Sequence, residues 1–281
     1  MIKTFFKGML MGICDIIPGV SGGTIAFILG IYERLINAIK NINIKFYNKE
    51  NLRKMDLKFL IPLGLGIVVA FGVGSRIVPY LLDNYPAYTF AFFFGLILGS
   101  IKLIHKKSKR LNLRRILAGV LMFLFAFWIA GLKTLTANHS YGIVFFSGIL
   151  AISAMLLPGI SGSFILLLLG QYKFMLEALK NFKVLYIVSF LIGAIIGLLG
   201  FSRLLSYLLK KYHSVTMWAL IGLMLGALRV PFDNIVFVKE LYPGLGFVWS
   251  LTSVVITSLL FLLGIFIIIK IGKLDKDSIN V

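Results

Sequence analysis

The residues best suited to chemistry are glycines, serines and a threonine in two matching stretches. The sequence PGVSGGT at residues 18–24 returns as PGISGSF at residues 158–164, 140 positions later. Glycine lets an anion approach the backbone closely, and hydroxyl groups add donors beside the free N–H groups that open a helix. The alternative is that these small residues only let membrane helices pack closely. The pattern favours a phosphate-binding site formed by Ser21, Gly22, Gly23 and Thr24 together with Ser161, Gly162 and Ser163.

Two arginines and one aspartate are charged residues that fall inside apolar stretches. Arg76 and Arg203 occupy equivalent places in the two copies, where each either binds an anionic headgroup or extends to the nearer membrane interface. Asp15 precedes the first Pro-Gly by three residues, and its counterpart in the second copy is Met155. A carboxylate at that depth indicates either proton or cation coupling, or a simple pairing with an arginine or a backbone donor.

The sequence predicts no catalytic residue, cofactor or metal. The single cysteine, Cys14, excludes an internal disulfide, and no group of His and Cys has metal-ligand spacing. The three histidines, His105, His139 and His213, fall in connections. Phosphate hydrolysis would need a base or nucleophile beside a cationic group, and neither stands in the two Gly-rich stretches.

These residues belong to a chain that is 59% hydrophobic, with a mean hydropathy of +0.99. One soluble core of 281 residues could not bury so much apolar surface, so the composition indicates an integral membrane protein. Stretches of about 20 apolar residues favour helices over a β-barrel and predict an all-α polytopic fold. The net charge of +19 comes from Lys and Arg in the connections, where they set topology and meet anionic lipid. Nucleic acid is therefore not an expected partner.

The two Gly-rich stretches must be breaks between helices. A helix running through Pro18 would lose about 3 kcal/mol there and about 1 kcal/mol at each glycine that follows. The arms beside each break are too short to cross a hydrocarbon core of about 30 Å, which predicts re-entrant hairpins. The prediction is two repeats, 1–135 and 136–281, each with a hairpin and three spans. The first repeat has its hairpin at 5–39 and spans at about 59–82, 86–104 and 114–135. The second repeat has its hairpin at 141–180 and spans at about 184–209, 214–229 and 247–269.

Ordered matches beyond the breaks indicate internal duplication. The separation is 140 positions around the breaks and 127 farther along the chain; Gly30, Tyr32, Arg76 and Tyr85 return as Gly170, Tyr172, Arg203 and Tyr212. Three spans in each repeat is an odd number, so the two repeats are predicted to have inverted topology. The Lys and Arg placement predicts cytoplasmic termini, although it favours re-entrant hairpins only slightly over crossing ones.

The run DIIPGVSGGT at residues 15–24, followed by FILGIYE at 27–33, resembles the polyprenyl-phosphate transporter family of the PopT type. The resemblance covers nearly the whole chain, including PGISG at 158–162 and GQY at 170–172. It implies a lipid flippase of the bacterial cytoplasmic membrane that returns undecaprenyl phosphate to the inner leaflet for cell-envelope biogenesis. The lipid and the bilayer are the implied partners, while lipid chain length, energy coupling, direction and oligomeric state stay open.

Two other functions fit part of this pattern. Membrane-embedded undecaprenyl-pyrophosphate phosphatases are similar in their inverted repeats and Pro-Gly-x-Ser breaks, but their breaks carry an arginine and an acidic catalytic partner. This chain has Gly22-Gly23 and Gly162-Ser163 at those places. A carrier for a small anion would need a continuous polar lining, whereas these spans consist mostly of Leu, Ile, Phe and Gly. We therefore expect a transporter and not an enzyme.

Overall fold

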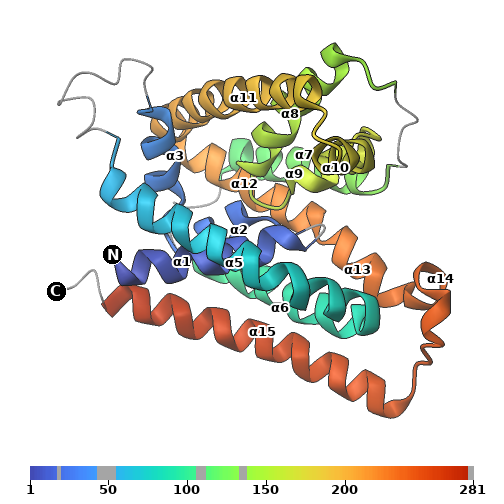
Figure 1. The fold of residues 1–281 in the computed structure, drawn as a ribbon. Coiled ribbons are helices and arrows are strands. Elements are labelled where there is room, and N and C mark those ends of the chain that lie inside the picture. Colours follow the sequence, from blue (N-terminus) through green and yellow to red (C-terminus); the bar gives the residue numbers. More distant parts are fainter. Residues whose placement is uncertain (18–19, 43–54, 106–111, 133–137, 278–281) are drawn as a thin grey trace.

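The computed structural model describes residues 1–17, 20–42, 55–105, 112–132 and 138–277, and these residues form helices without any strand (Figure 1). The predicted all-α fold is confirmed. The first half contains α1 (Ile2–Ile16), α2 (Gly22–Ile28), α3 (Tyr32–Lys40), α5 (Leu57–Asn84), α6 (Pro86–His105) and α7 (Leu113–Ala130). The second half contains α8 (Tyr141–Met155), α9 (Gly162–Leu168), α10 (Tyr172–Lys180), α11 (Val184–Lys211), α12 (His213–Ala227), α13 (Arg229–Val236), α14 (Val238–Leu241), the 3-10 helix η1 (Pro243–Leu245) and α15 (Leu251–Asp277).

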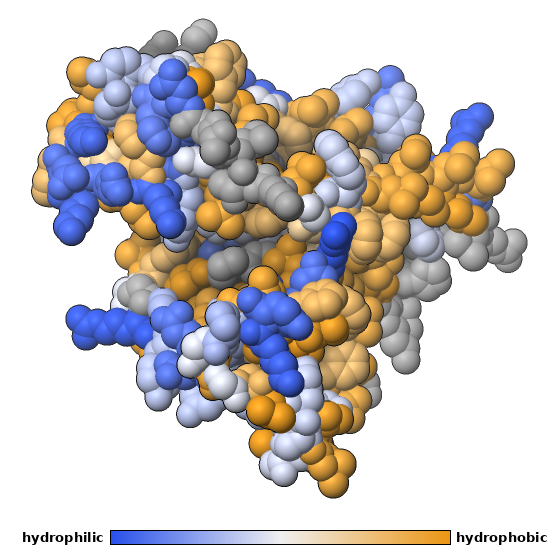
Figure 2. Space-filling view, turned by 90° about the vertical axis from the view of Figure 1, so that its right-hand side faces the viewer, coloured by the Kyte–Doolittle hydropathy of each residue, from blue (hydrophilic) through white to orange (hydrophobic). Residues whose placement is uncertain are grey.

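Several helices are long and apolar enough to cross a membrane. The described residues contain 5 such helices, or up to 8 spans if each bent pair of helices counts as one. Their outward faces carry exposed apolar side chains, and only 6% of α7 is buried. Seen from the end where α13 lies, the molecule is hollowed between two lobes and apolar over much of its flanks (Figure 2). Such flanks suit a hydrocarbon environment, and the chain is a multi-pass membrane protein.

Both Gly-rich stretches interrupt helices, as the sequence predicts. The first separates α1 from α2, and the second separates α8 from α9. Ser21 and Ser161 cap the helices that follow, because their hydroxyl oxygens accept from the N–H groups of Gly23 (3.1 Å) and Phe164 (3.2 Å). The Pro-Gly pair of the first stretch, at 18–19, lies outside the described residues.

The returning arm of each hairpin bends once more, and here the sequence prediction was wrong. In the hairpin predicted at 5–39, the arm that follows the break consists of α2 and α3, whose axes differ by 119°. In the second hairpin, α9 and α10 differ by 106°. Gly30 and Gly170 adopt left-handed φ angles of 68° and 67° at these bends, a conformation that glycine reaches without a steric penalty. Each hairpin therefore contains three short helices.

Two predicted spans in the second half have different boundaries in the structure. The span expected at about 214–229 corresponds to a longer apolar stretch, His213–Val236, which consists of α12 and, after Leu228, α13. The last span begins at Leu251 rather than near 247, because η1 and an irregular segment precede it. Gly246, with a φ of 57°, ends η1 in the left-handed conformation that stops a helix.

Equivalent segments of the two halves have equal lengths. α2 and α9 each contain 7 residues, α3 and α10 each contain 9, and α5 and α11 each contain 28. The turns after the long helices also match, since the Thr89 hydroxyl donates to the Tyr85 carbonyl (2.8 Å) and the Thr216 hydroxyl to the Tyr212 carbonyl (3.1 Å). The same side-chain hydrogen bond thus occurs in both halves, at positions 127 residues apart.

The long helices pack in equivalent pairs, α1 with α5 and α8 with α11, then α6 with α15 and α7 with α12. Glycines bring the paired backbones together: a Cβ at Gly8 would overlap the Leu63 carbonyl, and one at Gly148 would overlap the Phe190 carbonyl. The last two pairs each join helices from different halves. The two halves are therefore interlocked, and the two hairpins lie against each other.

Candidate functional site

The two breaks are in contact inside the bundle. The Gly159 N–H donates to Thr24 Oγ1 at 2.8 Å, and the Tyr32 hydroxyl donates to the Leu156 carbonyl at 2.8 Å. Ser21 adds a longer hydrogen bond, 3.4 Å, from its hydroxyl to another carbonyl of the second break. Ser21, Thr24 and Tyr32 are all buried. Three side chains of the first hairpin therefore bind the backbone of the second.

The first break already holds a carboxyl group, the side chain of Asp15. The Gly22 N–H donates to Asp15 Oδ1 at 2.6 Å, and a Cβ at Gly22 would overlap this carboxylate. The next two N–H groups, those of Gly23 and Thr24, donate to the hydroxyl (3.1 Å) and carbonyl (2.9 Å) oxygens of Ser21. The chain itself thus occupies the backbone N–H groups of Gly22, Gly23 and Thr24.

Asp15 binds the backbone of the break rather than an arginine. Its second oxygen, Oδ2, is buried and has no hydrogen-bond partner among the described residues. Asp15 also lines a cleft of about 260 Å³, together with Gly23, Tyr32 and apolar side chains of α8 and α11. The cleft lies between the two hairpins, next to the hydrogen bonds that join them.

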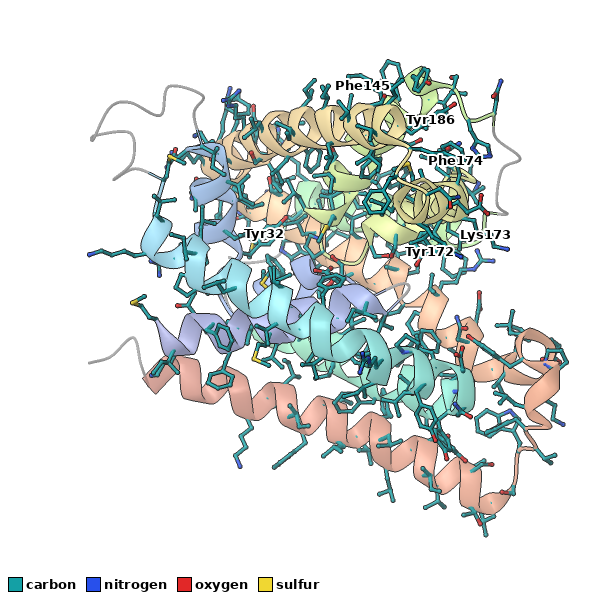
Figure 3. The ribbon with its side chains drawn as sticks, in the orientation of Figure 1. Tyr32, Phe145, Tyr172, Lys173, Phe174 and Tyr186 are labelled. Atoms are coloured by element: carbon teal, nitrogen blue, oxygen red, sulfur yellow. The ribbon has the colours of Figure 1, made fainter. Side chains whose placement is uncertain are left out.

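The second break is less enclosed than the first. Ser161 is buried, but Gly162 and Ser163 are half-buried, and the two serine hydroxyl oxygens lie 3.2 Å apart. The equivalent tyrosines also differ, because Tyr32 is 2% exposed and Tyr172 is 38% exposed. These two side chains lie well apart along the molecule (Figure 3). The matching hairpins are therefore in different surroundings in this structure.

The two predicted arginines do not reach the breaks. Arg76 on α5 and Arg203 on α11 are both exposed. Within the part of the chain that the structure describes, no hydrogen bond or ion pair links either guanidinium to the Gly-rich residues. The structure thus brings Asp15 and the serine, glycine and threonine candidates together, and leaves the arginines on the flanks.

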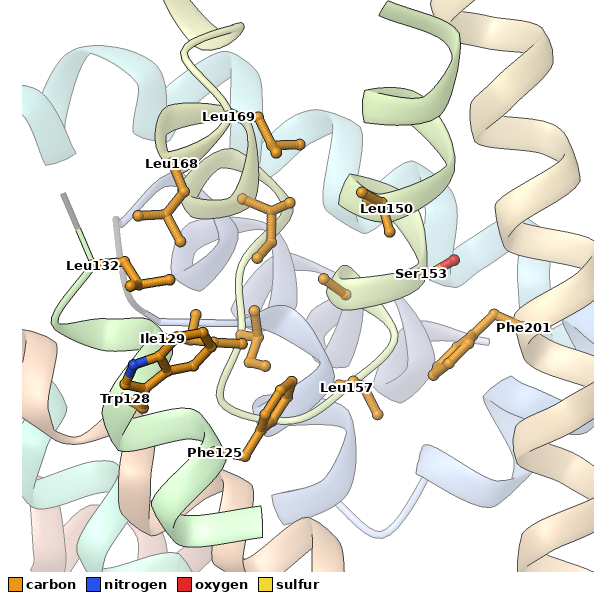
Figure 4. A pocket seen from close by; sticks show the side chains of 13 residues that line it. Phe125, Trp128, Ile129, Leu132, Leu150, Ser153, Leu157, Leu168, Leu169 and Phe201 are labelled. Carbon is orange, nitrogen blue, oxygen red and sulfur yellow. The ribbon is translucent and has the colours of Figure 1, made fainter. Parts of the chain in front are cut away.

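Two apolar clefts of about 410 Å³ each flank the breaks. One lies between α7, α8 and α9 and includes Leu157 and Ile160, which border the second Pro-Gly (Figure 4). The other lies between α1, α5, α6 and α15 and includes Ile17, which borders the first. Trp128, which lines the first of these clefts, is 61% exposed, so this cleft opens on the apolar flank. Hydrocarbon walls of this kind suit an alkyl or prenyl chain.

At the far end of the first hairpin, α3 makes polar contacts that the sequence did not predict. Glu33 Oε1 lies 3.0 Å from Nε2 of His213, a residue that the sequence assigns only to a connection. Lys40 donates to the Ser206 hydroxyl at 3.3 Å, and Ser206 donates to Asn37 at 2.9 Å. These contacts tie α3 to α11 and α12 of the other half. No spacing in the sequence signals a pairing over 180 positions. Among the described residues, no cluster of three or more His, Cys, Asp or Glu could hold a metal ion.

Comparison with known proteins identifies the family. A family model described as undecaprenyl phosphate translocase-like matches residues 11–241. A polyprenyl-phosphate transporter of Vibrio cholerae serotype O1 is 44% identical over 234 residues, which cover 81% of this chain and 76% of that protein. A polyprenyl-phosphate transporter of Staphylococcus aureus is 36% identical over 274 residues, which cover 88% of this chain and 93% of that protein. No solved structure matches the chain. These matches confirm the resemblance seen in the breaks, and the chain belongs to the undecaprenyl phosphate translocase-like family.

Proposed function

We propose that this protein moves undecaprenyl phosphate between the leaflets of the bacterial cytoplasmic membrane. The observation that carries the proposal is the contact between two donor-rich breaks inside an apolar bundle, with apolar clefts beside each break. A phosphate needs hydrogen-bond donors in a low-dielectric layer, whereas a prenyl chain can stay among hydrocarbon side chains. The names of the relatives support transport rather than hydrolysis, and the family supplies the identity of the lipid.

The proposed topology has two inverted repeats, 1–135 and 136–281, each with a re-entrant hairpin and three membrane-spanning helices. The equal helix lengths and the equivalent helix pairs support this arrangement. The start of α1 and the end of α15 lie at the same end of the molecule, which agrees with two cytoplasmic termini (Figure 1). In such a protein, the sites near the midplane lie where the two repeats meet.

The unequal hairpins support a mechanism of alternating exposure. Tyr32 is fixed to the Leu156 carbonyl, while the equivalent Tyr172 is exposed. By the 140-residue separation, the partner of Tyr172 in the opposite state would be the carbonyl of Ile16. In the proposed cycle one tyrosine bond breaks as the other forms, so the two hairpins exchange roles.

The headgroup follows a path from the outer to the inner leaflet in this proposal. It leaves the outer leaflet near Arg76 and reaches the inner one near Arg203, because exposed guanidinium groups can bind phosphate in a bidentate manner. Between these points the breaks supply the donors: Ser21, Gly22, Gly23, Thr24, Ser161, Gly162 and Ser163. Return of the lipid to the cytoplasmic side recycles it for cell-wall polymer synthesis.

The test uses purified protein in liposomes that contain undecaprenyl phosphate or, separately, undecaprenyl pyrophosphate. Leaflet accessibility of the lipid and release of inorganic phosphate are followed in the same sample, with protein-free liposomes as the control. We expect relocation of undecaprenyl phosphate and no phosphate release. Release of phosphate from the pyrophosphate would identify a phosphatase instead, and relocation no faster than in protein-free liposomes would remove this lipid as the cargo.

A further inference from the structure

Asp15 binds a backbone N–H group that the phosphate headgroup would also need. The Asp15 side chain accepts from the Gly22 N–H, the first N–H of α2, at 2.6 Å, and a phosphate oxygen would take the same kind of donor. A second oxygen of the same carboxylate is buried without a hydrogen-bond partner among the described residues. The headgroup and Asp15 therefore compete for one donor.

The surroundings of Asp15 offer little to stabilise a displaced negative charge. Of the elements that wall its cleft, α5, α8 and α11 present only Ile, Leu, Met and Ala, and α2 presents Gly23. Among the described residues that line the cleft, the one other ionisable group is Tyr32 of α3, whose hydroxyl already donates to the Leu156 carbonyl. On α1 itself, the neighbouring Cys14 is buried, and the Lys7 ammonium donates to the Leu29 carbonyl. Arg76 and Arg203 are exposed on the flanks of α5 and α11.

We propose that Asp15 carries a proton that moves with each lipid headgroup, an inference that rests on the proposed transport function. When the phosphate takes the Gly22 N–H, the carboxylate is displaced into an apolar cleft, where the neutral acid is far less costly to bury than the anion. Asp15 then accepts one proton from the water on the side from which the headgroup entered. On release to the other side, Asp15 returns that proton to water and rebinds Gly22. One O–H bond forms and the same bond breaks in each cycle.

Only one half of the molecule has a residue suited to this role. Met155 stands at the position equivalent to Asp15, so the second break has no group that could take a proton in the same way. One proton per headgroup is the expected ratio. A proton gradient directed into the cytoplasm would then drive the lipid toward the inner leaflet.

The experiment measures the final distribution of undecaprenyl phosphate across proteoliposomes with an imposed pH difference and the voltage clamped to zero. With one proton per lipid, one pH unit should give about a tenfold excess of lipid in the leaflet on the alkaline side. Asp15→Asn keeps an acceptor for the Gly22 N–H but cannot carry a proton, so its lipid should distribute evenly. Asp233→Asn is the matched control, since Asp233 is a partly exposed carboxylate beside Arg229, and its tenfold excess should persist.

The outcomes separate this inference from the transport proposal. Wild-type protein that relocates lipid without responding to the pH difference would overturn the role of Asp15 and leave transport intact. A persisting excess in the Asp15→Asn variant would also overturn it. No relocation by the wild type under any condition would instead refute the transport function. If Asp15→Asn fails to fold, the wild type decides the matter: proton uptake into the vesicles must match lipid movement one to one.

Discussion

Removal of the Tyr32 hydroxyl tests whether one hydrogen bond holds the first hairpin in its present position. We call this position, with Tyr32 bonded to the Leu156 carbonyl, the closed state, and the position without this bond the open state. In Tyr32→Phe the Leu156 carbonyl loses its 2.8 Å side-chain donor in a buried site, which should cost about 1–3 kcal/mol. If that cost falls on the closed state alone, the open state becomes about 5- to 150-fold more populated. Tyr172→Phe is the matched comparison: the Tyr172 side chain is exposed in this state, so its loss leaves the closed state intact and weakens only the opposite one.

The chain carries its own probe for this change. Cys14 is the single cysteine, is buried, and belongs to the same apolar core as Tyr32. Its rate of modification by a membrane-permeant maleimide should therefore rise with the open population of the hairpin. We expect faster labelling in Tyr32→Phe. Labelling in Tyr172→Phe should be no faster than in the wild type, because this change removes a bond only from the opposite state. Equal rates in the wild type and in Tyr32→Phe would refute the idea that this bond determines the state of the hairpin.

Three further changes test the break, the helix crossing and the flanks. Thr24→Val leaves the buried Gly159 N–H without its acceptor and should lower the free energy of unfolding by about 1–3 kcal/mol. Thr24→Ser keeps a hydroxyl acceptor and should leave the free energy of unfolding unchanged. Thermal unfolding in detergent measures both variants. Gly8→Ala forces a methyl group against the Leu63 carbonyl and should cost about 1–3 kcal/mol, while Gly64→Ala, with open space around it, should be neutral by the same assay. Arg76→Ala and Arg203→Ala should each slow lipid relocation about tenfold or more without loss of folded protein, and unchanged rates would remove both residues from the path.

Much of the fold can be predicted from the sequence because its causes are local. Pro and Gly make a continuous helix too costly at both breaks, and the length of the apolar runs limits the rest to membrane-spanning helices. The second bend of each hairpin, at Gly30 and Gly170, was missed, since a single glycine within a helical pattern is often tolerated. Thr89 and Thr216 were missed as well, because their role is visible only once the turns are folded.

The sequence by itself determined that this is a helical membrane protein, that its chain is interrupted twice by the same donor-rich pattern, and that its two halves are related. These properties follow from backbone costs and apolar length, which act within a few turns of helix. Only the tertiary structure decided that Asp15 binds the Gly22 N–H of its own break, and that Tyr32 reaches a carbonyl 124 positions away while Tyr172 stays exposed. Matching sequences adopt matching local conformations, but packing between distant segments decides which of the two tyrosines is buried and which is exposed.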